Sequence, residues 1–187
     1  MKIFNLLSLT VLLFFTSCDN SKNNNSPESE KETGISWGEN PWPDIRKQRI
    51  NKLLPEALEA AKVDSWLIVC RENNNDPLAH HIGGENAGGT AAFLFYNDNS
   101  GFHSVAFSPS GESKALDDLD IHDSVVSVER NSSALEQAAN FIKQKDFQKV
   151  AINSSESNSM ADGLSYNQRM ELESYLESYS NRLVPST

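Results

Sequence analysis

Apolar residues after position 41 first recur at the spacing of a helix. They form one stripe, at Ile50, Leu53, Leu54, Ala57, Leu58 and Ala61. We expect the helix to begin at residues 42–44, with Asp44 near its N-cap, because a carboxylate can accept hydrogen bonds from the free N–H groups there. Pro55 lies inside the pattern and lacks a backbone donor, so it should kink or divide the helix. The basic residues are expected on the solvated face, at Arg46, Lys47, Arg49 and Lys52.

Three apolar runs follow, and each predicts a β-strand. The run at residues 66–70 is continuous, which is typical of a strand covered on both faces. Residues 90–96 and 102–107 are joined by the sequence Asn-Asp-Asn-Ser-Gly. These residue types favour a tight turn, so the two strands are expected to form a hairpin.

Strands and helices alternate in the rest of the chain. Apolar runs predict strands at residues 124–128, 149–152 and 182–184. Helical spacing predicts one helix capped by Ser132 or Ser133 and another at residues 167–179. The element order is a helix, three strands and then β-α-β-α-β. A three-strand meander followed by crossovers predicts an α/β fold, with helices on both faces of one mixed sheet.

The segment between the first two strands, residues 71–89, combines polar side chains with glycine. A polar loop of this length inside a compact domain is usually functional or disordered, and this unrepetitive composition favours a shaped site. Its polar side chains are therefore candidates for a cleft-facing site: Asn75, Asp76, His80, His81, Glu85 and Asn86. Pro77 forces Asp76 into an extended conformation, so Asn75 and Asp76 can bond the local backbone. A purely structural loop is the open alternative.

The same segment lacks the spacing of a metal site. The adjacent residues His80 and His81 point in different directions, and Gly83 and Gly84 break any helix that would align His81 with Glu85. A metal site needs three or four convergent ligands. The glycines are also not followed by a lysine and a helix, which argues against a phosphate-binding loop. The sequence predicts no metal-binding or cofactor-binding residue in this chain.

Nucleophilic catalysis by the chain itself has little support in the sequence. A Gly-x-Ser-x-Gly motif is absent, and His103 and His122 have no evident acidic partner. A nucleophile, a base and an orienting group would have to converge, so we predict no catalytic residue. Cys70 ends an apolar run and is expected to be a small buried residue, with a disulfide to Cys18 or a reactive thiol as alternatives.

The first 41 residues have a different character. Lys2 precedes an apolar run that is shorter than the roughly 20 residues of a spanning helix, which predicts a signal peptide at residues 1–17. The sequence Phe-Thr-Ser-Cys that ends at Cys18 resembles a bacterial lipobox, which implies lipid attachment at Cys18; ordinary secretion is the alternative. Residues 18–41 are rich in Asn, Ser, Glu and Lys and are expected to be a disordered tether. Residues 42–187 remain as one domain.

The chain is acidic, with a formal net charge of −10, which becomes −11 when Lys2 is lost with residues 1–17. This charge disfavours nucleic acid and anionic lipid headgroups as direct ligands. We therefore expect contact with a membrane only through the lipid anchor, at a bacterial cell envelope.

Three segments together resemble the amino-terminal domain of the creatinase/prolidase family, which includes Xaa-Pro peptidases. They are IRKQRINKLLPEAL at residues 45–58, VDSWLIVCRENNNDPLAHHIGGENAGGTAAFLF at residues 63–95 and FHSVAFSPSGE at residues 102–112. The resemblance covers about residues 43–185. It implies a ribonuclease-H-like domain that precedes a pita-bread metallopeptidase domain.

In that family the second domain holds two divalent metals, for which manganese is expected, and this chain ends before such a domain. The resemblance thus implies a truncated or split, non-catalytic part of a Xaa-Pro peptidase-like lipoprotein. It would shape a peptide cleft and support a homodimer, with a peptide substrate or a metal-binding peptidase half as its partner. A stand-alone envelope lipoprotein that binds a peptide or protein is the alternative.

Overall fold

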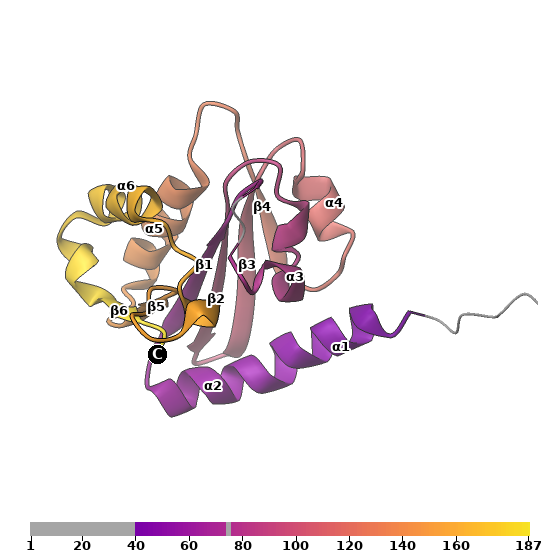
Figure 1. The fold of residues 1–187 in the computed structure, drawn as a ribbon, viewed down its shortest axis with the longest axis horizontal. Coiled ribbons are helices and arrows are strands. Elements are labelled where there is room, and N and C mark those ends of the chain that lie inside the picture. Colours follow the sequence, from indigo (N-terminus) through magenta and orange to yellow (C-terminus); the bar gives the residue numbers. More distant parts are fainter. Residues whose placement is uncertain (1–39, 74–75) are drawn as a thin grey trace, which may run out of the picture. The chain divides into compact units, whose positions relative to one another are not determined.

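The computed structural model describes residues 40–73 and 76–187 (Figure 1). The predicted signal peptide at residues 1–17, the lipidated Cys18, most of the tether and Asn75 lie outside the described residues.

Six strands form one mixed sheet in the order β4-β3-β2-β1-β5-β6. β2 is antiparallel to both β1 and β3. The parallel pairs are β3 with β4, β1 with β5, and β5 with β6. The predicted meander and crossovers are confirmed. The bounds are Ser65–Cys70 for β1, Ala91–Asp98 for β2, Gly101–Pro109 for β3, Ser124–Val128 for β4, Val150–Ile152 for β5 and Leu183–Pro185 for β6.

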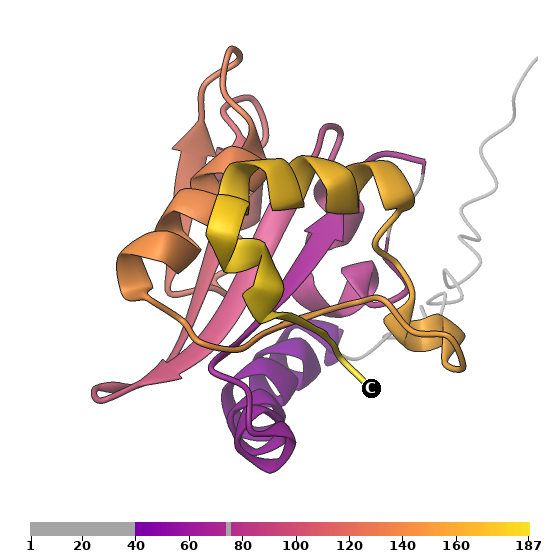
Figure 2. The same cartoon turned by 90° about the vertical axis from the view of Figure 1, so that its left-hand side faces the viewer.

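Helices cover both faces of the sheet (Figures 1 and 2). Alternate residues of β1 explain the two layers: Leu67 and Val69 pack toward α5 and α6, whereas Ile68 packs on the face of the N-terminal helix. The α5 layer comprises α5 (Ala134–Lys145), α6 (Tyr166–Leu176) and the 3₁₀ turn η4 (Glu177–Arg182), so the predicted last helix ends three residues early. The other layer includes α3 (Ala79–Ile82) and α4 (Ser113–Asp117), which the apolar pattern did not predict. The 3₁₀ turns η2 (Gly84–Asn86) and η3 (Ser159–Ala161) complete the elements.

The N-terminal helix is divided as Pro55 predicts. It consists of α1 (Trp42–Gln48), the π-helical turn η1 (Arg49–Leu53) and α2 (Leu54–Ala61). In η1 the N–H of Leu54 donates to the carbonyl of Arg49, five positions back. Pro55 has no backbone N–H and cannot donate the next helical hydrogen bond, and the wider turn before it is compatible with that missing bond.

Asp44 lies in the first turn of this helix, near the N-cap as expected, while Pro41 occupies the N-cap itself and the N–H of Trp42 donates to Asn40 Oδ1 at 3.1 Å. The apolar stripe is only partly buried, because Leu53 is 58% exposed and Ala57 and Ala61 are exposed as well. Within the described ranges, no helix is both long enough and apolar enough to span a membrane.

Candidate functional site

The loop between β1 and β2 is a folded unit anchored by Asp76. The Oδ1 atom of Asp76 accepts a hydrogen bond from the N–H of Leu78 at 2.9 Å, and its carbonyl accepts one from Ala79 at 2.8 Å. This confirms that Asp76 bonds the local backbone. Gly83 then ends α3 in the left-handed region, with φ of 83°, so the chain turns before Glu85 as predicted.

Asp76 also fixes the loop to the end of the sheet. Its side chain is buried, and Oδ2 accepts a hydrogen bond from Nδ2 of Asn153 at 2.7 Å. Asn153 Oδ1 in turn accepts from Trp66 Nε1 at 2.8 Å and from Ser186 Oγ at 3.1 Å. Burial raises the pKa of Asp76, while the two hydrogen bonds oppose that shift. This network joins the loop to β1, β5 and the C-terminal segment, which is a positioning role.

Arg46 joins the loop to α1, and its expected place on the solvated face is wrong. The side chain is buried at 5% exposure. Nη2 donates to the carbonyl of His80 at 2.8 Å and to Glu85 Oε1 at 2.5 Å. Acceptors offset the desolvation of a buried guanidinium group, and the loop supplies two of them to Nη2, while the buried Nε has no partner among the described residues.

Trp42 and two histidines extend this contact. The His80 ring stacks on Trp42 with centroids 4.7 Å apart, and the His81 ring lies 5.5 Å from Trp42 at a tilted angle. The guanidinium groups of Arg46 and Arg49 lie 5.4 Å and 5.5 Å from the same ring. Residues 42, 46 and 49 are four and three positions apart and therefore share one helix face. This spacing is the sequence signal that could have predicted the cluster.

The contact with Arg49 selects one tautomer of the neutral His81 ring. Its Nδ1 atom lies 2.9 Å from Arg49 Nη1, and because arginine can only donate, Nδ1 accepts. Burial lowers the pKa of His81, and the charge of Arg49 adds to that effect. The neutral ring therefore keeps its proton on Nε2.

The remaining candidates are placed differently. Asn86 ends η2 and is exposed, with its N–H donating to the Gly83 carbonyl at 3.3 Å. The N–H groups of Gly88 and Gly89 donate to Glu112 Oε2, at 2.9 Å and 3.4 Å. Glu112 thus holds the glycine segment in place, a role for which the local sequence gives no signal.

An apolar groove opens beside the histidine cluster. Its volume is about 240 Å³. The π-helical turn η1 forms one wall, α3 and Leu78 form another, and Trp66 and Ile68 of β1 form the floor. Arg49 and His81 are the polar groups of its lining.

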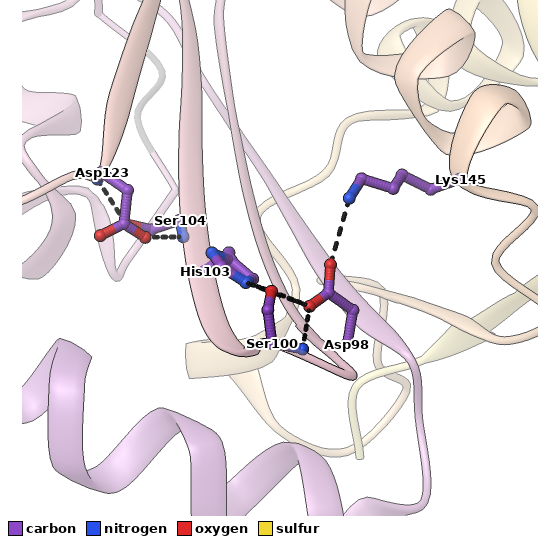
Figure 3. A network of polar contacts seen from close by, with 6 residues as sticks. All are labelled: Asp98, Ser100, His103, Ser104, Asp123 and Lys145. Atoms are coloured by element: carbon purple, nitrogen blue, oxygen red, sulfur yellow. Dashed lines mark hydrogen bonds and ion pairs between the residues drawn. The ribbon is translucent and has the colours of Figure 1, made fainter.

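A second polar cluster lies at the β2–β3 turn (Figure 3). His103 has an acidic partner after all, since its Nε2 atom lies 3.1 Å from Asp98 Oδ1, and 2.8 Å from Ser100 Oγ. Lys145 also binds Asp98, at 3.1 Å, and these hydrogen bonds, with that of Ser100 foremost, lower the pKa of Asp98. Both contacts of His103 use the same ring nitrogen, so Asp98 does not orient the ring for Ser100 as in a catalytic triad.

Figure 3 also shows Asp123 with Ser104, a separate pair in which Asp123 Oδ2 accepts from the Ser104 N–H at 2.7 Å. Across residues 40–73 and 76–187, no three His, Cys, Asp or Glu side chains converge in a way that could hold a metal ion. The described residues do not fit a dinuclear metal centre.

Comparisons with known proteins bear on the fold. No family model and no curated protein matches the chain. Among solved structures, it is similar to the Xaa-Pro dipeptidase from Bacillus anthracis, with a TM-score of 0.51 and 12% identity over 76% of this chain and 33% of that chain. For aminopeptidase P from Streptococcus thermophilus the TM-score is 0.49 and the identity is 13%, over 78% of this chain and 92% of that chain. For the N-terminal domain of Xaa-Pro dipeptidase from Lactobacillus brevis the TM-score is 0.46 and the identity is 12%, over 74% of this chain and 89% of that chain.

The match thus spans about a third of the length of the Bacillus anthracis enzyme. At this identity the similarity concerns the fold, and it confirms the resemblance inferred from the sequence at that level. The chain shares its fold with part of the Xaa-Pro dipeptidase from Bacillus anthracis.

Proposed function

We propose that this chain is a non-catalytic domain that shapes a peptide-binding cleft in a Xaa-Pro peptidase-like lipoprotein and supports its dimerisation. The observation that carries the proposal is the fold shared with the Bacillus anthracis dipeptidase over a third of its length. The loop from Asp76 to Asn86 supports it, because Arg46 and Asn153 hold this loop in one shape before any ligand binds. Preorganised loops lose less entropy on binding.

The chemistry of peptide cleavage belongs in this proposal to a separate metal-binding peptidase half, which would hold two divalent ions such as manganese. Cys18 would carry the lipid that anchors the protein at a bacterial cell envelope. Mass spectrometry of the mature chain tests that assignment, since an unmodified Cys18 would contradict it.

A stand-alone lipoprotein that binds a peptide or protein is the second candidate. The apolar groove beside Arg49 favours it, because such a groove is a recognition surface that requires no second domain.

The test is hydrolysis of Xaa-Pro dipeptides by the full chain with added manganese. We expect no turnover by the chain alone, and turnover above the manganese blank would overturn the non-catalytic proposal.

Binding of non-hydrolysed tripeptides, followed by NMR, tests the cleft. We expect His80→Ala with His81→Ala to weaken binding and the control Lys114→Ala, on the exposed side of α4, to leave it unchanged. Equal effects of the two variants would count against the loop as part of the cleft.

A further inference from the structure

We infer that the groove between η1 and α3 binds the last residue of a peptide, with an apolar side chain in the groove and the terminal carboxylate on Arg49. This inference rests on the proposed peptide-binding function and names the class of ligand. It concerns residues of the N-terminal helix that the sequence pattern assigned to an apolar stripe and, for Arg49, to the solvated face.

The size and lining of the groove select a single apolar side chain. Its volume of about 240 Å³ lies below the range of about 300–1,000 Å³ that is typical of pockets for whole small molecules. Its apolar lining comes from Ile50, Leu53, Leu54, Trp66, Ile68, Leu78 and Ile82. An occupant held by these side chains is recognised by burial of apolar surface.

The floor and the η1 wall of the groove are preorganised. Trp66 of the floor is fixed by its hydrogen bond to Asn153, and Arg49 of η1 is fixed by the Trp42 ring and by His81 Nδ1. π-helical turns such as η1 often mark functional sites. Little ordering is therefore needed when a ligand enters.

Charge complementarity selects a carboxylate beside the apolar group. Arg49 donates to His81 through Nη1 and is exposed at the groove's edge, so its other N–H donors are accessible to a ligand there. A guanidinium group matches a carboxylate in geometry and charge. Arg49 is the arginine in the groove's lining, so the charge that meets a ligand there is that of its guanidinium group.

The terminal residue of a peptide meets both requirements at once. Its Cα atom bears the side chain and the carboxylate, so one group can enter the groove while the other reaches its edge. Aspartate and glutamate side chains carry the charge on the group that would have to enter the apolar groove, which disfavours them.

The experiment is an NMR titration of the full, isotope-labelled chain with Ala-Ala-Leu and with its C-terminal amide. We expect the free acid to shift the amide signals of Ile50, Leu78 and Ile82 and to bind about fivefold more tightly than the amide, as fits an exposed charge-assisted contact. Arg49→Gln should remove that difference. Arg130→Gln, which changes an exposed arginine outside the groove, should preserve it. Leu53→Glu changes an exposed position of the lining and should weaken binding of the free acid, because the new carboxylate repels that of the peptide.

The other outcomes separate this inference from the proposed function. Equal binding of acid and amide, or shifts that leave Ile50 and Leu78 unmoved, would overturn the carboxylate site and leave peptide binding by the domain intact. Groove signals that move with protein concentration alone would assign the groove to a second copy of the chain and overturn the inference. Absence of any shift with either peptide would overturn the inference and the proposed cleft together.

Discussion

Arg46 of α1 and Glu85 of η2 lie 39 positions apart in sequence and form a part-buried ion pair, with Nη2 and Oε1 at 2.5 Å. The same nitrogen binds the carbonyl of His80 at 2.8 Å. One side chain of the first helix thus binds the segment that holds the candidate site at two points, in its middle and near its end. This relationship makes the shape of the loop depend on α1.

Replacing Arg46 with methionine should lower the free energy of unfolding by about 2 kcal/mol, because Glu85 and the His80 carbonyl lose a shared donor. Urea denaturation measures the change, and Lys47→Met on the exposed side of the same helix is the matched control. A double-mutant cycle with Glu85→Gln then isolates the pair. Equal stability of the Arg46 and Lys47 variants would show that the ion pair does not brace the loop.

Gly163→Ala should be among the most damaging small substitutions. A Cβ atom at this glycine would lie 2.0 Å from Asp76 Oδ2 and 2.8 Å from Asp76 Cα, so backbone would have to move. We expect a loss of about 3 kcal/mol, the upper end for overpacking. Gly111→Ala, which meets no atom within 4 Å, is the control and should change stability by less than about 0.5 kcal/mol. A tolerated Gly163→Ala would contradict the close approach of this segment to the loop.

The sheet could be predicted because its central strands are buried on both faces, so that residues 66–70 and 90–96 read as continuous apolar runs. The hairpin followed from its turn residues. The contact of His103 with Asp98 could also have been predicted, because the hairpin register places His103 beside Tyr96, near the turn that Asp98 begins.

Arg46 could not be placed from the local pattern, because its burial depends on Glu85, a partner that only the tertiary fold supplies. Leu53 was misplaced for a related reason. The proline predicted a break but not its form, and Leu53 lies at the end of the π-helical turn, where it is exposed. The short helix α3 was missed because four residues give no periodicity to read.

His122 should make stability depend on pH below neutrality. Burial lowers the pKa of His122 from 6.5 to about 4 in the folded chain, where one ring nitrogen lies 2.8 Å from the Ile82 carbonyl. Between these two values the unfolded chain binds the additional proton, so this residue's contribution is complete above pH 6.5 and falls as the pH drops toward 4. The loss should reach about 3 kcal/mol. Unfolding of His122→Gln, measured across the same range, should show a shallower decline; parallel curves for the two proteins would contradict this assignment.

Cys70 should behave as an inert thiol as long as the chain is folded. The side chain is free and buried, and burial raises the pKa of the Cys70 thiol to about 12, with the nearby charge of Asp76 adding to the effect. Because the thiolate is the reactive species, a disulfide reagent at mildly alkaline pH should modify Cys70 only after unfolding. The Cys18→Ser variant removes the other thiol and isolates this measurement. Gly84→Ala would place a Cβ atom 2.5 Å from Cys70 Sγ, so it should loosen the packing and speed the reaction. Labelling of folded Cys18→Ser as fast as in guanidinium chloride would contradict the burial of Cys70 and, with it, the packing of η2 against the end of β1.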